Sequence, residues 1–137
     1  MDGKAISDVV QEGVDVPNLW CVPATIDLAG AEIELVSMVA RETRMQRALS
    51  AYLADAADRG EERLDYVLID CPPSLGLLTV NAFVAADEVF IPIQCEYYAL
   101  EGLSQLLNNV ELIKTHLNPG LHVSTILLTM YDALPRR

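Results

Sequence analysis

Apolar residues recur along this chain in two patterns, one typical of amphipathic helices and the other of buried strands. Spacings of three and four are clearest from residue 98 to residue 117, where leucine, isoleucine and valine predict a long helix that ends before Pro119 and Gly120. Further helices are predicted over residues 6–14, 28–40 (after an N-cap at Asp27), 43–60 (ending at Gly60) and 77–86.

Strands are predicted in the stretches between these helices. The run LDYVLID at 64–70 is almost continuously apolar, as a strand buried on both faces of a parallel sheet requires. The other predicted strands cover 19–22, which we expect to be short and buried, 88–93 and 121–130. Strands and helices alternate without a hairpin signal, so we expect one α/β domain over residues 1–137, with a mainly parallel sheet and helices on both faces.

Composition and charge narrow the class of protein. The chain has 137 residues, 52% of them hydrophobic, and a net charge of −11. A packed domain is therefore expected, and generic nucleic-acid binding by this chain alone is disfavoured because phosphates would be repelled. Arg41, Arg44 and Arg47 lie near one helix face, and we interpret them as a solvated face that pairs with nearby acids rather than as a docking site.

The cysteines and the N-terminus bear on the compartment. Cys21, Cys71 and Cys95 are far apart and form no C-x-x-C pair, so neither a disulfide framework nor a zinc cluster is indicated. The N-terminus lacks the apolar segment of a secretory signal, and no apolar run approaches the roughly 20 residues that a membrane span needs. The sequence therefore predicts a cytoplasmic protein.

A phosphate-binding loop is the first motif to test, because an aspartate that ends an apolar strand, like Asp70, often holds a metal ion beside a bound phosphate. Such a loop needs glycines followed by lysine and serine or threonine at the start of a helix. The Gly-Lys pair at Gly3-Lys4 is followed by Ala5, and no glycine precedes it at the required spacing. No phosphate loop occurs in these 137 residues.

Two other interpretations of the same stretch fail on spacing. A cysteine phosphatase needs an arginine six residues after its nucleophile, and six residues after Cys71 stands Leu77. A phospho-receiver domain needs a basic residue at a later strand end, which the stretch LLTMYD at 127–132 lacks. Cys71 itself is interpreted as a small buried thiol rather than a reactive one.

Three stretches together resemble one specific family. They are LWCVPATIDLAGAEIELV (19–36), DYVLIDCPPSLGLLTVNAFVAADEVFIPIQCEYYALEGLSQLL (65–107) and LNPGLHVSTILLTMYD (117–132). They are similar to the ParA/Soj chromosome- and plasmid-partitioning ATPases, relatives of MinD and of the nitrogenase iron protein. The resemblance implies a P-loop NTPase-like fold with Mg²⁺ and ATP as cofactors. It also implies a homodimer that closes on ATP and binds nucleoid DNA without sequence preference, and a ParB-like partner that stimulates hydrolysis.

The resemblance also assigns roles to residues. Asp70 matches the Walker B-like aspartate that reaches the magnesium ion, usually through a bound water; Mg²⁺ prefers oxygen ligands and keeps several waters. Cys71 to Gly76 match the switch II segment, in which Pro72 and Pro73 stiffen the exit from the strand and Gly76 permits a turn. From the residues alone, an ordinary rigid connection between a strand and a helix is the favoured interpretation.

Other family features are weaker here or absent. Glu96 begins the segment EYYALEG, which the resemblance places near the nucleotide in a supporting role. The Walker A loop, the D-x-D-P-Q-G-N stretch and the C-terminal region do not occur, so we expect the middle of such a protein, with no catalytic residue of its own and no activity alone. The alternatives are a non-catalytic interaction module that pairs with an intact relative, and a fragment of a MinD-like cell-division ATPase.

The missing strands affect the expected stability. In the family's sheet, the strand YVLID at 66–70 lies between two strands that are absent here, so its N–H and C=O groups would lose their partners. Each buried unpaired group costs roughly 1–3 kcal/mol, and a domain is stabilised by only about 5–15 kcal/mol. We therefore expect the chain alone to be unstable, rearranged or prone to aggregate at exposed strand edges.

Overall fold

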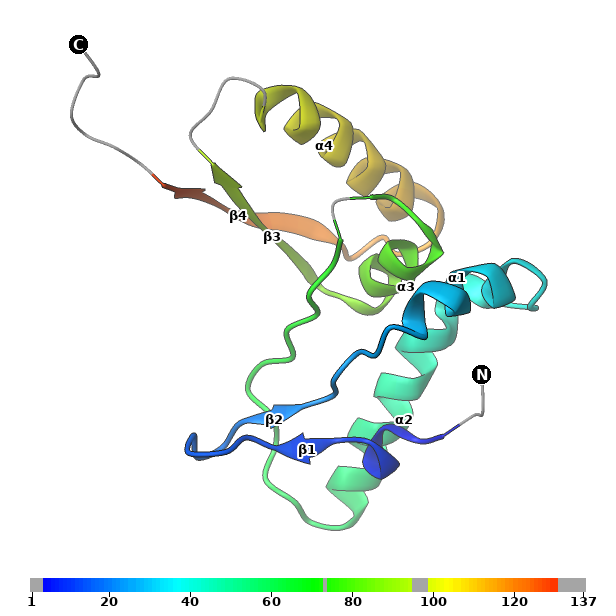
Figure 1. Cartoon of the computed structure of the whole chain (residues 1–137), viewed down its shortest axis with the longest axis vertical. Helices are drawn as coiled ribbons and strands as arrows, with labels where there is room; N and C mark the ends of the chain where they lie inside the picture. Colours follow the sequence, from blue (N-terminus) through cyan, green and yellow to red (C-terminus); the bar gives the residue numbers. More distant parts are fainter. Residues whose placement is uncertain (1–3, 73, 95–98, 131–137) are drawn as a thin grey trace. The chain divides into compact units, whose positions relative to one another are not determined.

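The computed structural model describes residues 4–72, 74–94 and 99–130, and the chain forms two compact units, Met1–Ala85 and Ala86–Arg137 (Figure 1). The first unit contains the 3₁₀ helices η1 (Ile6–Asp8) and η2 (Arg41–Thr43), the strands β1 (Gln11–Glu12) and β2 (Trp20–Cys21), and the helices α1 (Leu28–Val36), α2 (Arg44–Asp58) and α3 (Leu77–Ala85). The second contains β3 (Glu88–Gln94), α4 (Ala99–His116) and β4 (His122–Thr129).

The second unit is a strand–helix–strand crossover. β3 and β4 are parallel and pair from Glu88 opposite His122 to Gln94 opposite Thr129, with a shift of register after Val89. These elements confirm the strands predicted over 88–93 and 121–130 and, within the described residues, the helix predicted over 98–117. The buried residues of this unit are Val89, Ile91, Val110, Ile113 and Leu121.

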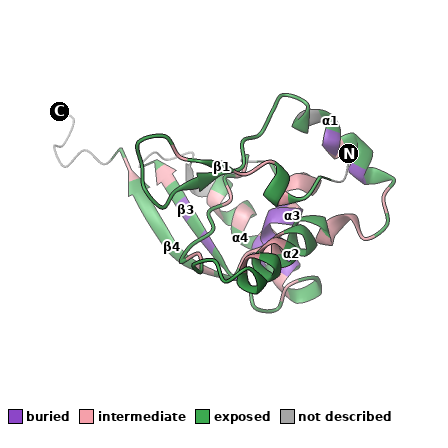
Figure 2. Cartoon of the chain, turned by 90° about the horizontal axis from the view of Figure 1, so that it is seen from below, coloured by how far each residue is buried: buried purple, intermediate pink, exposed green. Residues whose placement is uncertain are grey.

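The first unit is built mainly on the packing of α2 and η2 against α3. Figure 2 shows buried residues on α3 and on one side of α1. The helices predicted over 43–60 and 77–86 are confirmed. Gly60 ends α2 as predicted: it adopts φ 70°, its N–H donates to Ala57 O at 3.0 Å, and the next N–H donates to Ala56 O at 3.0 Å. This pair of bonds is a Schellman motif, which favours glycine because a Cβ strains the left-handed region.

The helix predicted over 28–40 forms but ends early, at Val36. Ala40 adopts a left-handed backbone (φ 52°), which a right-handed helix cannot contain. Arg41 Nη1 donates to Val36 O at 2.8 Å, so its guanidinium satisfies a carbonyl at the end of α1. Asp27 occupies the N-cap position as predicted, but its side chain makes no capping hydrogen bond.

The N-terminal part of the chain differs from the prediction. The helix predicted over 6–14 is wrong beyond the short η1, because the chain continues into β1, which pairs antiparallel with β2. The strand predicted over 19–22 exists as β2 but is exposed rather than buried. Asp15 (φ 63°) and Asn18 (φ 60°) supply the left-handed residues of the connecting turn, a hairpin signal carried by Asp and Asn.

The apolar run at 64–70 forms no strand, and the predicted strand is wrong. Among the described residues it belongs to neither sheet, and Tyr66 and Leu68 are 85% and 92% exposed. A strand exists only when its backbone groups pair with another strand, and among the described residues no strand pairs with this run. Exposed apolar side chains in such a run favour self-association.

A pair of matched truncations tests this description of the exposed run. Leu68→Ala should change the free energy of unfolding by less than about 0.5 kcal/mol, because the side chain is exposed, and should reduce aggregation. Leu35→Ala removes a side chain that is 2% exposed and should cost about 2–5 kcal/mol. Urea denaturation and light scattering measure both effects, and equal destabilisation by the two variants would show that 64–70 is packed.

Candidate nucleotide-binding segment

Asp70, the predicted magnesium-side carboxylate, lies just before the connection that leads into α3. The residue is exposed, and within the described part of the chain its carboxylate has no hydrogen-bond or ion-pair partner. An exposed carboxylate without a protein partner keeps its oxygens available for a cation or its water shell. The position therefore suits the role that was predicted from the sequence.

Cys71, next along the chain, is half-buried with a free thiol, and its Sγ lies 3.5 Å from Ile69 O. Burial raises the pKa of the Cys71 thiol, and the charge of the Asp70 carboxylate raises that pKa further. Both effects favour the neutral thiol at neutral pH. This supports the interpretation of Cys71 as an unreactive thiol rather than a nucleophile.

Gly76, at the start of α3, lies against a side chain of α1, a contact that the sequence did not reveal. Its φ is not in the left-handed region, so the turn itself does not demand glycine. Instead, a Cβ built on Gly76 would lie 2.8 Å from Glu32 Cδ and would overlap Glu32 Oε1. The carboxylate of α1 therefore lies against the backbone at the N-terminal end of α3, where the helix dipole favours negative charge.

Polar side chains of α3 fix the end of this connection. Thr79 Oγ1 donates to Ser74 O at 2.7 Å, and Gly76 O accepts the Val80 N–H at 3.0 Å. Thr79 is buried although it is polar, and its hydroxyl is satisfied by this bond. Ser74 and Gly76 are thus tied to the first turns of α3.

The opposite side of α3 is bonded to the start of α2. Asn81 Nδ2 donates to Arg41 O and to Leu77 O, both at 2.8 Å, and Asn81 Oδ1 accepts the Met45 N–H at 3.1 Å. Met45 N–H is one of the donors that a helix start leaves without an intrahelical partner. Thr43, the N-cap of α2, makes no capping bond, because its hydroxyl donates to Ala40 O at 3.1 Å instead. Asn81 therefore caps α2 from a residue far away in the sequence.

The other predicted site residues add less. Pro72 is exposed, and Pro73 and Glu96 lie outside the described residues. The described part of the chain contains no group of three or more His, Cys, Asp or Glu side chains that could hold a metal ion. One exposed carboxylate suits Mg²⁺ only when nucleotide phosphates and waters complete the shell, which is the usual way proteins hold this ion.

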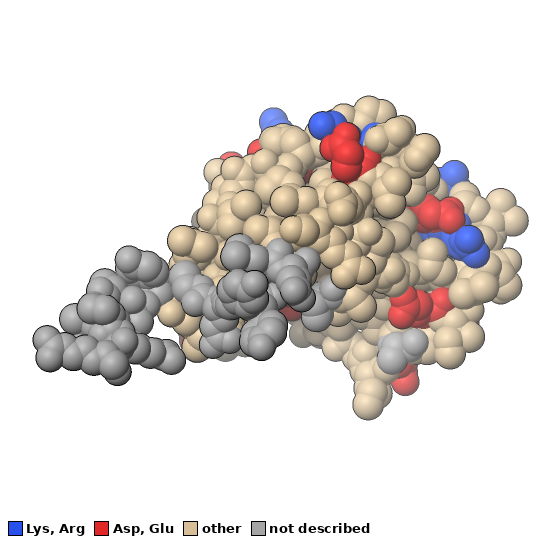
Figure 3. All heavy atoms as spheres, turned by 90° about the horizontal axis from the view of Figure 1, so that it is seen from above, with Lys and Arg blue, Asp and Glu red and all other residues tan. Residues whose placement is uncertain are grey.

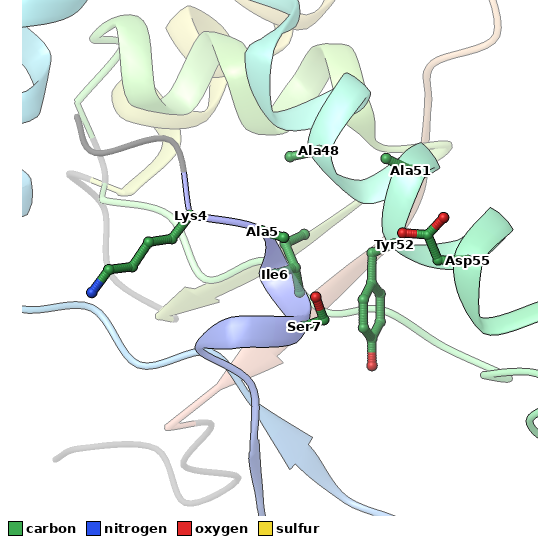
Figure 4. A pocket seen from close by; sticks show the side chains of 8 residues that line it. All are labelled: Lys4, Ala5, Ile6, Ser7, Ala48, Ala51, Tyr52 and Asp55. Atoms are coloured by element: carbon green, nitrogen blue, oxygen red, sulfur yellow. The ribbon is translucent and has the colours of Figure 1, made fainter. Parts of the chain in front are cut away.

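A separate pocket of about 220 Å³ lies between η1 and α2 (Figure 4). Tyr52 and Asp55 line it together with Lys4 and Ser7, and none of these is a predicted site residue. The Lys4 side chain points away from Tyr52 and Asp55 in Figure 4, so the polar groups do not converge. The pocket is also smaller than the roughly 300–1,000 Å³ of common ligand sites, and we assign it no ligand.

Charged side chains are mixed rather than segregated. Arg41 Nε donates to Glu42 Oε1 at 2.8 Å, as expected for a face that pairs with nearby acids. On the part of the face that Figure 3 shows and the structure describes, basic and acidic side chains lie side by side instead of forming one basic patch. In the described part of the chain, no helix is both long and apolar enough to cross a membrane.

Glu32, Thr79 and Asn81 are the residues that sequence reasoning missed. Each acts on a residue outside its own sequence neighbourhood or on the turn before its helix, so periodicity does not identify the contact. A signal did exist for two of them: Thr79 and Asn81 are the polar residues within the otherwise apolar stretch 77–86. A polar residue on the buried face of a helix needs a partner, and that requirement could have marked both.

The chain is similar to a known protein family and to several known proteins. A family described as "AAA domain" matches residues 1–123. The chain is 54% identical over 133 residues to the sporulation initiation inhibitor protein Soj of Bacillus subtilis, covering 97% of this chain and 49% of Soj. It is 56% identical over 115 residues to the chromosome partitioning protein ParA of Myxococcus xanthus, covering 84% of this chain and 38% of ParA.

Among solved structures, the chain is similar to cobyrinic acid a,c-diamide synthase from Mycobacterium smegmatis with bound ADP and magnesium. The TM-score is 0.80 at 38% identity, and the match covers 93% of this chain and 48% of that protein. The likeness confirms the predicted α/β, P-loop NTPase-like fold class. The chain spans about half the length of Soj.

Replacing Gly76 tests its contact with Glu32. Gly76→Ala should destabilise the first unit, and the loss should be smaller in a Glu32→Ala background because the overlap is then gone. The coupling energy, from urea denaturation of both single variants and the double variant, should be about 0.5 kcal/mol or more.

The matched control is Gly30→Ala in α1, where a new Cβ meets no atom within 4 Å. This change should stabilise the helix by roughly 0.5–1 kcal/mol, since alanine is the better helix former. Additive effects of Gly76→Ala and Glu32→Ala would contradict the contact.

The pH dependence of alkylation tests the surroundings of Cys71. With Cys21 and Cys95 replaced by serine, the rate–pH profile of Cys71 should lie above the ordinary thiol pKa of about 8.5. Asp70→Asn should move the profile to lower pH, because a charge that opposes the thiolate is removed. Asp58→Asn is the control and should leave it unchanged.

The raised pKa of the Cys71 thiol also makes the stability of the fold depend on pH. Because the folded-state pKa of the thiol is raised, its stabilising contribution is fully present below the ordinary thiol pKa and is lost as pH rises through the raised value. An Asp70→Asn profile identical to that of the parent would place Asp70 away from the thiol.

Proposed function

This chain belongs to the AAA-domain family, within its ParA and Soj group of partitioning proteins, and we propose that its residues supply the magnesium side and switch segment of an ATP-dependent chromosome or plasmid partitioning ATPase. In this proposal Asp70 orients a water of a nucleotide-bound Mg²⁺, and residues 71–76 respond to the state of the nucleotide. The proposal is limited to these roles, since the chain spans about half of Soj.

The observation that carries the proposal is the position of Asp70. It is exposed, and within the described residues its carboxylate has no partner. The connection that follows it ends in a buried, hydrogen-bonded helix, where Thr79 bonds Ser74 O and Asn81 bonds the start of α2. A cation ligand on one end and a fixed helix on the other is an arrangement that a nucleotide-dependent switch requires.

The cofactors and partners are part of the proposal. Mg²⁺ and ATP are supported by the ADP and magnesium bound to the cobyrinic acid a,c-diamide synthase. In the whole protein we propose an ATP-closed homodimer that binds DNA without sequence preference and is stimulated by a ParB-like partner, in the cytoplasm at the nucleoid. The net charge of −11 disfavours DNA binding by this chain itself, so we propose that the DNA-binding surface comes from the rest of the whole protein.

A second candidate function is a non-catalytic module that pairs with an intact relative. The exposure of Tyr66 and Leu68 favours it, because an apolar run without a partner strand can add to another sheet. It would predict that this chain inhibits an intact relative without binding nucleotide.

A chimera tests the proposed function. The 133 matched residues of Bacillus subtilis Soj are replaced by those of this chain, and ATP hydrolysis with Mg²⁺ is measured. The chimera should hydrolyse ATP. Asp70→Ala in the chimera should reduce kcat by about a hundredfold, because the carboxylate that orients the magnesium water is lost.

Two controls accompany the chimera. Asp87→Ala, which removes another exposed aspartate, should leave hydrolysis unchanged. The 137 residues alone should bind no Mg-ATP at millimolar concentration by isothermal titration, since no phosphate loop occurs in them. Full activity of the Asp70→Ala chimera, or stoichiometric binding by the chain alone, would contradict the proposal.

A further inference from the structure

Asn81 is a buried amide whose bonds all go to the backbone. Its side chain is 4% exposed, and it uses both donors of Nδ2 and one lone pair of Oδ1 in three hydrogen bonds of 2.8 to 3.1 Å. Two of the three partners, Arg41 and Met45, lie about one helical turn apart at the junction of η2 and α2. The amide therefore fixes the position of α3 relative to this junction.

Further hydrogen bonds hold α3 against α2 at one end and attach α3 to the preceding chain at the other. Gln46 Nε2 donates to Val84 O at 3.1 Å, one turn after Asn81, so two successive side-chain bonds link α2 with α3. At the other end, Thr79 Oγ1 bonds Ser74 O, and Gly76 O accepts the first helical bond. A short helix held at both ends transmits the position of one end to the other.

We propose that Asn81 is a positioning residue for the connection between Asp70 and α3, acting through Thr79 although it touches neither Asp70 nor Ser74. Without its amide, α3 loses its bonds to Arg41 and Met45 and keeps the Gln46 bond, so the helix to which Ser74 and Gly76 are bonded is held less firmly against α2. A consequence of this positioning for function rests on the proposed role of Asp70. The effect of Asn81 on the connection itself does not depend on nucleotide.

The thiol of Cys71 reports on that connection. In the full chain with Cys21 and Cys95 replaced by serine, Asn81→Ala should raise the alkylation rate of Cys71 about tenfold at fixed pH without denaturant. The reason is that the connection opens locally more often when α3 is no longer bonded to α2. Thr79→Val, which removes the bond to Ser74 with little change of shape, should raise the rate in the same direction, and it serves as the second variant if Asn81→Ala does not fold.

Two controls separate positioning from general destabilisation. Leu35→Ala opens a cavity in the same unit but leaves the bonds of Asn81 intact, so it should lower the urea midpoint while raising the Cys71 rate far less than Asn81→Ala. Asn108→Ala removes an exposed amide from α4 and should change neither quantity.

The outcomes are distinguishable. Equal Cys71 rates in Leu35→Ala and Asn81→Ala variants of similar midpoint, or no rise in either Asn81→Ala or Thr79→Val, would overturn the positioning role. A rise in both, together with full ATP hydrolysis by the Asp70→Ala variant of the Soj chimera, would support the positioning role and contradict the proposed function.

Discussion

The Asn81 amide is the interaction on which the candidate site depends most. Its Oδ1 accepts a hydrogen bond from the Met45 N–H of α2, and its Nδ2 donates to Arg41 O of η2 and to Leu77 O of α3. Elements separated by up to 40 residues in sequence thus share one buried group. Removing it leaves the Met45 N–H and the Arg41 C=O, both only partly buried, without this partner. Ser74 and Gly76, at the end of the connection that follows Asp70, are bonded to the helix that this amide holds.

The candidate site combines a fixed part with an open part. Thr79, Ser74 and Gly76 belong to the fixed part, and the Glu32 carboxylate from α1 lies against Gly76, so a larger residue there would have to displace it. Asp70 belongs to the open part, with an exposed carboxylate directed by no protein partner in the described residues. Such a division is what a magnesium-dependent switch needs, because the ligand end must follow the nucleotide while the other end transmits its position.

The helices could be predicted from the sequence because a helix satisfies its own backbone. The long helix α4 follows from apolar spacing, and the end of α2 follows from Gly60, whose Schellman bonds are local. The run at 64–70 was mistaken for a strand because apolar continuity describes only what a strand would bury. Whether it forms depends on partner strands that the run itself cannot reveal, and here it remains exposed.

Only the part of the candidate site that consists of consecutive residues could be predicted from the sequence. Asp70 and the segment after it are recognisable from consecutive residues, whereas Glu32 and Asn81 act on residues 36 to 44 positions away. The hairpin turn was not predicted either. Asp15 and Asn18 adopt its left-handed backbone, but aspartate and asparagine favour that conformation only modestly. Long-range polar contacts are therefore where the structure added most to the sequence.

The central claim is that Asp70 lies at the magnesium ion of a bound nucleotide. Its most direct test is paramagnetic broadening of a fluorine label on Cys71 in the Soj chimera, with Mn²⁺ and ADP replacing Mg²⁺ and ATP. The account predicts strong broadening of the Cys71 signal that disappears in the Asp70→Ala variant. Broadening that is absent, or that is unchanged by Asp70→Ala, would contradict it.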